Sequence, residues 1–171
     1  MNKPLQDHIC EERLFSTLFE KYAKDLHDFL FYKFGSHLNP KDKVQEAFVK
    51  LWENCATIPP DKAKSFLFTT ANNLMLNEFA HQKVVLRHQK SQPKSYTNES
   101  PEFLLQEKEY QQKLDNAIAN LTEAQRVAFL MNRVEGKRFK EIAKLLDIST
   151  KAVEKRIYGA LKQLRKDIEG L

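Results

Sequence analysis

Four side chains near the end of the chain have the types and spacing of a surface that binds a polyanion. Lys151, Lys155, Tyr158 and Lys162 recur every three or four residues, which places them on one face of a helix. Lysine ammonium groups and a tyrosine hydroxyl donate hydrogen bonds to phosphate oxygens. We interpret this face as a candidate nucleic-acid surface. The alternative is the solvated basic face of an ordinary helical hairpin.

The apolar residues around this face predict how it is positioned. They repeat at helical spacing in two runs, with Ile148 between them in a tight turn. Ser149 precedes the second run, where its hydroxyl can accept a hydrogen bond from a free backbone N–H. Residues 139–158 therefore have the layout of a helix-turn-helix, whose second helix enters the major groove of DNA. The apolar positions are Ile142, Ala143, Leu145, Leu146, Val153, Ile157, Leu161, Leu164 and Ile168.

The distribution of charge agrees with a nucleic-acid partner. The chain of 171 residues has a formal net charge of +5. That charge divides into +2 for residues 1–90, −2 for 91–109 and +5 for 110–171. A basic excess in the part that contains the helix-turn-helix is the electrostatic footprint expected for binding DNA.

Other classes of function find little support. Cys10 and Cys55 are isolated from each other, with no CxxC pair, so we expect two free thiols in a reducing cytoplasm. The charged N-terminus and the lack of a long apolar run predict a soluble protein with no membrane segment. Enzyme chemistry, cofactors and metals are not expected, because five scattered histidines form no ligand or catalytic pattern. These histidines are His8, His27, His37, His81 and His88.

Helical periodicity predicts an all-α fold of two small helical domains joined by a flexible linker. Helices are expected over residues 11–34, 40–57, 65–88 and 103–120, followed by one with a capping box at Thr122 and Gln125 and then by the helix-turn-helix. The polar, proline-containing stretch 90–101 reads as the linker. The predicted domains are 1–90 and 110–171, with 91–109 between them.

The second predicted helix has an unusual outer face. Opposite an apolar stripe of Val44, Phe48, Leu51 and Trp52, it alternates charged and hydrogen-bonding side chains. This face is either a protein-docking surface or a solvated one, and Trp52 is expected in the core. The outer residues are Asp42, Gln45, Glu46 and Lys50.

The third predicted helix combines aromatic rings, amides and a cation. Phe66, Asn72, Asn73, Asn77 and Lys83 form the mixture that a single-stranded nucleic-acid site uses, with rings for base stacking, amides for base edges and lysine for phosphate. Packing of the phenylalanines in the core, with Asn73 bonded inside the bundle, is the alternative.

Two blocks of sequence then carry a resemblance. Residues 42–52 (DKVQEAFVKLW) and 66–77 (FLFTTANNLMLN) form the first block. LTEAQRVAF from residue 121, Glu135-Gly136, EIA from residue 141 and Ile148-Ser149 form the second. In this order they resemble the small extracytoplasmic-function (ECF) group of bacterial sigma factors, across nearly the whole chain.

The resemblance implies a cytoplasmic subunit of RNA polymerase that directs DNA-templated transcription initiation at specific promoters. Its implied partners are core RNA polymerase, through the beta-prime clamp and beta subunits, promoter DNA as duplex and single strand, and an anti-sigma factor or an auxiliary DNA-targeting partner. The first domain would bind polymerase and open the minus-ten element, with the loop at residues 54–65 beside the flipped base. The second would bind the minus-thirty-five element.

The resemblance also assigns residues to these roles. Polymerase would be bound by Asp42, Gln45, Glu46 and Lys50; the minus-ten strand by Phe66, Asn72, Asn73, Asn77 and Lys83; and the minus-thirty-five duplex by Ser149, Thr150, Lys151, Glu154, Lys155, Arg156 and Tyr158.

The chain departs from the family pattern mainly in the third helix. Asn72 stands where the family usually has arginine, Asn77-Glu78 where it has Asp-Tyr, and Ala80 begins a stretch that is usually basic. Asp147 replaces the usual turn glycine, which an aspartate in a left-handed conformation can do. Fewer cations mean fewer phosphate contacts. We therefore hypothesise weakened promoter reading that depends on another DNA-bound partner, protein or guide-directed.

One rival interpretation is a stand-alone helix-turn-helix regulator that binds operator DNA. It explains residues 139–158 equally well but leaves residues 42–52 and 66–77 unexplained.

Overall fold

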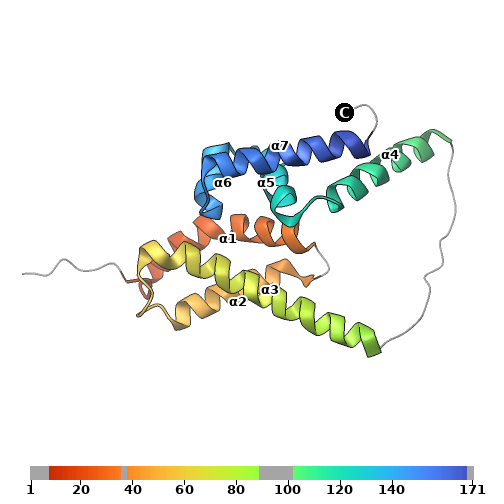
Figure 1. Cartoon of the computed structure of the whole chain (residues 1–171). Helices are drawn as coiled ribbons and strands as arrows, with labels where there is room; N and C mark the ends of the chain where they lie inside the picture. Colours follow the sequence, from red (N-terminus) through yellow and green to blue (C-terminus); the bar gives the residue numbers. More distant parts are fainter. Residues whose placement is uncertain (1–7, 36–37, 89–101, 169–171) are drawn as a thin grey trace, which may run out of the picture. The chain divides into compact units, whose positions relative to one another are not determined.

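The chain is all-helical in the part that the structure describes, as predicted. The structure is a computed structural model that describes the backbone of residues 8–35, 38–88 and 102–168 and the side chains of these residues outside 82–110. Within these ranges it contains seven α-helices, short 3₁₀ segments and no strand. The elements, labelled in Figure 1, are α1 (Glu12–Phe34), α2 (Pro40–Glu53), η2 (Pro60–Lys62), α3 (Ala63–His88), α4 (Glu102–Ala119), α5 (Glu123–Arg133), α6 (Phe139–Leu146) and α7 (Thr150–Asp167).

The chain forms two compact units, Met1–Lys90 and Ser91–Leu171. The residues predicted to be a linker, 90–101, lie outside the described ones. Helix α4 begins at Glu102, so the predicted linker segment 91–109 contains its first two turns.

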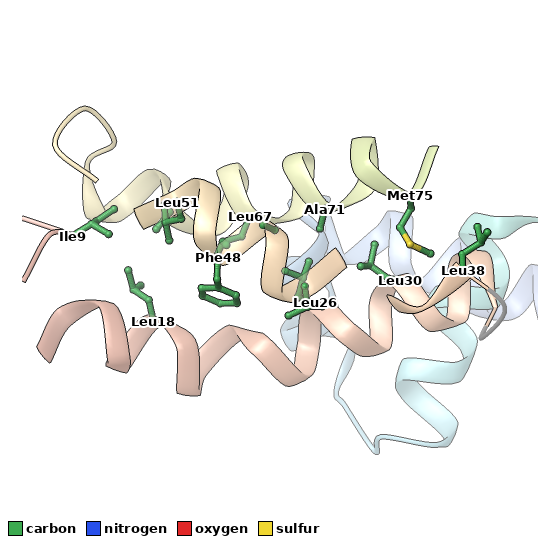
Figure 2. Packing of buried hydrophobic residues seen from close by; sticks show 13 residues of the cluster. Ile9, Leu18, Leu26, Leu30, Leu38, Phe48, Leu51, Leu67, Ala71 and Met75 are labelled. Atoms are coloured by element: carbon green, nitrogen blue, oxygen red, sulfur yellow. The ribbon is translucent and has the colours of Figure 1, made fainter. Parts of the chain in front are cut away.

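In the first unit, α1, α2 and α3 pack against one another around one apolar core. Each helix contributes a stripe of apolar side chains, and Figure 2 shows the resulting row, with Ile9 at one end and Leu38 at the other. Burial of these side chains is the main favourable contribution to folding. The core residues are Ile9, Leu18, Leu26, Leu30, Leu38, Val44, Ala47, Phe48, Leu51, Ala63, Leu67, Ala71 and Met75.

The predicted helix ends of this unit are largely confirmed. Helix α1 stops before Gly35, whose φ of 85° suits glycine and whose N–H bonds to the Phe31 carbonyl. Helix α2 starts at Pro40 after Asn39, which has a left-handed φ of 47° and no side-chain capping bond. It ends at Glu53, a turn earlier than predicted, because the Asn54 side chain and N–H both bond to the Lys50 carbonyl.

The prediction of two free thiols was wrong. Cys10 and Cys55 form a disulfide, with their Cα atoms 5.0 Å apart. They are separated by 45 residues in the sequence, but packing of α1 against α2 brings the segment before α1 beside the turn that follows α2. This proximity depends on tertiary structure, so the spacing of the cysteines gave no sign of it.

Trp52 is not a core residue, contrary to the prediction. It is 44% exposed and lies at the edge of the apolar stripe of α2, where its ring meets Phe15 of α1 edge-on at 5.0 Å. The other members of the predicted stripe, Val44, Phe48 and Leu51, are buried.

In the second unit, α4, α5 and α6 all pack on α7, and α5 also contacts α6. Ala117 and Leu121 meet Ala160, Leu164 and Ile168 in one buried cluster. This packing gives α7 a buried side and a solvent-facing side.

Two details fix α5 within this unit. The Arg126 guanidinium donates to the carbonyls of Ala119 and Leu121, which ties the α4–α5 turn to α5. Gly159 gives Gln125 room, because a Cβ atom at Gly159 would lie 2.8 Å from Gln125 Nε2.

The predicted capping box is confirmed. The Thr122 hydroxyl accepts a hydrogen bond from the Gln125 N–H at 3.3 Å, and the Gln125 side chain accepts from the Thr122 N–H at 3.2 Å. These bonds satisfy two backbone donors at the start of α5.

Candidate nucleic-acid and protein interfaces

The basic face of α7 is exposed as the sequence predicts. Lys151, Lys155, Tyr158 and Lys162 face solvent, while Val153 and Ile157 are buried on the opposite side. Of the other residues assigned to this face, Ser149, Thr150 and Glu154 are exposed and Arg156 is half-buried.

The N-terminus of α7 has groups that can bind an anion. The Ser149 hydroxyl accepts a hydrogen bond from the Ala152 N–H at 3.1 Å, which leaves its own O–H to donate outward. Free backbone N–H groups at a helix start and a nearby lysine together suit a phosphate. The first turn of α7 contains no acidic residue.

The turn before α7 forms with an aspartate at its centre. Asp147 has φ 57° and ψ 46°, the left-handed conformation that glycine usually occupies, as predicted. The N–H groups of Asp147 and Ile148 both bond to the Ala143 carbonyl. The exposed Asp147 carboxylate adds a negative charge beside the basic face.

The outer face of α2 combines polar and apolar side chains. Asp42 and Gln45 are exposed, and on the same face Val49 is 55% exposed. Trp52 lies at its edge. Together these four residues, separated by three or four positions, form what we call the α2 outer face. Sequence reasoning named Asp42 and Gln45 but missed Val49, although its spacing marks it as a member.

Glu46 and Lys50 lie on the flank of α2, and both are half-buried. Lys43 Nζ lies 3.6 Å from Glu46 Oε2 and 3.6 Å from Oε2 of Glu78 in α3. Glu46 therefore belongs to a charge network that links α2 to α3, and its removal would disturb that network as well as any docking surface.

The exposed side of α3 has amides and apolar groups. Asn73 and Asn77 are exposed, which excludes the alternative of Asn73 bonded inside the bundle. Leu76 and Phe79 are 46% and 50% exposed. Phe66 is half-buried against the core, so the packing alternative holds for it in part. The side chain of Lys83 lies outside the described residues.

Asn72 is held by a cation from another helix. The Lys33 ammonium of α1 donates to Asn72 Oδ1 at 2.8 Å, and it lies 5.2 Å from the centre of the Phe34 ring. Sequence reasoning missed Lys33, because the two residues are 39 positions apart and no local pattern joins them. The sequence has no lysine or arginine at positions 65–82, so Lys33 brings positive charge to the middle of α3.

In the described part of the chain, no three histidine, cysteine, aspartate or glutamate side chains gather as a metal site would require. None of the described helices is long and apolar enough to cross a membrane. The helix-turn-helix of α6 and α7 defines a helical protein of the DNA-binding class.

Comparison with known proteins identifies the family. Residues 18–84 match the model of Sigma-70 region 2, and residues 111–164 match the model of Sigma-70, region 4, in that order. The chain is 24% identical over 165 residues to the ECF RNA polymerase sigma factor SigX of Bacillus subtilis (strain 168), a match that covers 92% of this chain and 85% of SigX. The chain belongs to the ECF sigma factors, which act with RNA polymerase in transcription initiation.

Proposed function

We propose that the first unit binds core RNA polymerase through the α2 outer face and the melted minus-ten strand through α3. The second unit binds the minus-thirty-five duplex through the basic face of α7. The protein works in the cytoplasm with the polymerase clamp as its main contact and directs initiation at a defined set of promoters.

The observation that carries the docking proposal is the exposure of Val49 and Trp52 beside Asp42 and Gln45. Exposure of a tryptophan and a valine next to each other is unfavourable in water, and such apolar patches mark interaction surfaces. An aromatic and an aliphatic side chain surrounded by polar groups is typical of the centre of a protein interface.

A pull-down with core polymerase tests the docking surface. Gln45→Ala with Val49→Ala removes two exposed side chains and leaves the network of Lys43, Glu46 and Glu78 intact. We expect this double variant to lose the complex, because interface centres supply most of the binding free energy. Glu20→Ala, an exposed change on α1, is the control and should bind like the unmodified protein. Equal binding by the double variant would refute docking through this face.

We also propose that this protein binds promoter DNA weakly unless a second DNA-bound factor assists it. The exposed side of α3 offers amides and apolar groups to DNA, and its supply of positive charge at Asn72 comes from one lysine of α1. With few phosphate contacts, the minus-ten interaction supplies little sequence-independent affinity. Stable initiation then needs a second DNA-bound factor, a protein or a guide-directed complex, that holds polymerase at the promoter. An anti-sigma factor is a further partner of the first unit.

Transcription with purified core polymerase and this protein alone tests that dependence. The template is a promoter found by mapping transcript ends in cells, with both elements present. We expect weak initiation at physiological salt and a clear increase at low salt, because low salt strengthens the few phosphate contacts available. Strong initiation at physiological salt would contradict the proposal.

A further inference from the structure

The disulfide lies at the start of the loop assigned to the melted strand. It joins Cys10, just before α1, to Cys55, just after α2, and residues 54–62 then lead into α3. We propose that Cys10 and Cys55 form a reversible thiol–disulfide pair that controls the mobility of the 54–62 loop and, through it, the affinity for melted promoter DNA. This inference rests on the proposed function and on the family resemblance, which implies that the loop at residues 54–65 lies beside the flipped base.

The two cysteines remain neighbours when the bond is open. Ile9 is fully buried in the core, so it anchors the segment before α1 independently of the sulfur atoms. The Glu11 N–H bonds to the His8 carbonyl at 2.9 Å, which closes that segment into a turn. On the other side, the Cys55 N–H bonds to the Trp52 carbonyl at 3.1 Å. These contacts keep both thiols in place for the bond to form again.

The bond is placed for exchange with solutes. Cys10 is exposed, and Cys55 is half-buried and packs against the core. Thiol–disulfide exchange needs access of an attacking thiolate to a sulfur atom. In a reducing compartment, where polymerase works, disulfides are usually transient and redox-sensing.

The loop itself is restrained at several points. The Asn54 carbonyl accepts hydrogen bonds from the N–H groups of Thr57 and Ile58, at 3.0 and 3.2 Å. Pro59 and Pro60 fix the next two φ angles, and η2 follows. The disulfide adds a covalent restraint at the start of this loop. A loop that is ordered beforehand loses less conformational entropy when it binds, so the oxidised form should bind melted DNA more tightly.

The chemistry balances with a low-molecular-weight disulfide as oxidant. The thiolate of Cys10, the more exposed of the two residues, attacks one sulfur of the oxidant and releases one thiol as a mixed disulfide forms. The Cys55 thiolate then attacks Cys10 Sγ and releases the second thiol. Two protein thiols are oxidised and one small disulfide is reduced to two thiols. Reduction by a small thiol runs through the same steps in reverse.

The first experiment tests the switch without DNA. The full chain is equilibrated in buffers of reduced and oxidised glutathione, its thiols are capped with a maleimide, and the protein mass is measured. The chain has two cysteines, so each redox state has a distinct mass after capping. Trp52 is the one tryptophan, and its carbonyl accepts a hydrogen bond from the Cys55 N–H, so its fluorescence reports on the turn that contains Cys55. We expect full interconversion while circular dichroism stays helical. A bond that folded protein neither loses nor regains in these buffers would overturn the proposal.

The second experiment measures binding of a fluorescein-labelled single strand, the minus-ten strand of the promoter mapped by its transcript ends, to core polymerase with this protein. Core polymerase alone is the blank. We expect about threefold to tenfold tighter binding by the oxidised form, recovered when reduced protein is reoxidised. Cys10→Ser with Cys55→Ser should match the reduced form in either buffer.

The outcomes separate the two proposals. Binding above the blank with equal or weaker affinity in the oxidised state overturns the switch and leaves the proposed function standing. No binding above the blank in either state overturns the proposed function and, with it, the switch.

Discussion

The two units have very different exposed helix faces. Helix α7 of the second unit has an outward face of lysines that starts at a helix end capped by Ser149, with no acidic residue in its first turn. Helix α3 of the first unit has an outward face of amides, Leu76 and Phe79. The first unit also contains a disulfide, whereas the structural devices described in the second unit are hydrogen-bonded helix caps.

The contrast indicates a division of labour. A cationic face gains affinity by releasing counterions from duplex DNA, and this gain falls with salt. A face of amides and apolar groups gains affinity from stacking and base-edge contacts, which requires strands that are already separated. The second unit should therefore supply duplex affinity, and the first should act after melting. The predictions below change one side of this contrast at a time.

The largest expected effect concerns the covalent bond. Reduction, or Cys10→Ser with Cys55→Ser, should lower the free energy of unfolding of the first unit by about 2–4 kcal/mol, because the bond closes a loop of 45 residues in the unfolded chain. Trp52 fluorescence, which reports the first unit alone, should show a lower denaturation midpoint. Circular dichroism follows both units and should show the second unchanged. An unaltered Trp52 midpoint would contradict this expectation.

The next effect tests the cationic face. Lys151→Ala with Lys155→Ala should weaken duplex binding by about tenfold or more and reduce the slope of log affinity against log salt by roughly two. Fluorescence anisotropy with several duplex sequences measures both quantities. Lys113→Ala, an exposed change on α4, is the control. A uniform loss across sequences fits phosphate contacts, whereas a loss confined to one sequence would show that these lysines read bases and would contradict this prediction.

Adding positive charge to α3 tests the contribution of the first unit. Ala80 and His81 are exposed, and Ala80→Arg with His81→Arg adds two cations there. We expect about fivefold tighter binding of single-stranded DNA by the polymerase complex and stronger initiation without a helper. Glu20→Arg, an exposed change on α1, makes the same change in net charge on a different helix. If it acts equally, net charge rather than the α3 surface is responsible.

Much of the fold could be predicted because it is encoded locally. Helical periodicity, Gly35, Pro40, the Thr122 capping box and the turn at Asp147 each depend on residues within a few positions of one another, and each appears as expected. The basic face of α7 follows from the same periodicity.

What could not be predicted depends on contacts between distant segments. The Cys10–Cys55 bond and the Lys33–Asn72 hydrogen bond join residues 45 and 39 positions apart, and both need α1 to be packed before they exist. Trp52 was assigned to the core because periodicity places it at the edge of an apolar stripe. The depth of burial at such an edge depends on the neighbouring helix, here Phe15 of α1.

Two matched helix caps give a smaller effect and separate stability from binding. Ser149→Ala and Thr122→Ala each remove a hydroxyl that accepts a backbone N–H, so each should cost about 1 kcal/mol of stability in the second unit. Only Ser149 lies at the helix end that we propose faces DNA. Thermal unfolding should show similar losses, and duplex affinity measured well below the midpoint should fall for Ser149→Ala alone. A similar fall for both variants would show that the cap acts through folding.

The smallest effect concerns Asp147, where conformation and charge can be separated. Asp147→Gly removes the carboxylate and suits φ 57°, so we expect stability to rise by a few tenths of a kcal/mol up to about 1 kcal/mol. Asp147→Asn removes the same charge and tolerates the left-handed conformation, so its stability should change less. Both variants should bind duplex DNA about twofold more tightly, because a negative charge beside the phosphates is lost. If only the glycine variant gains affinity, the turn conformation and not the charge limits the basic face of α7.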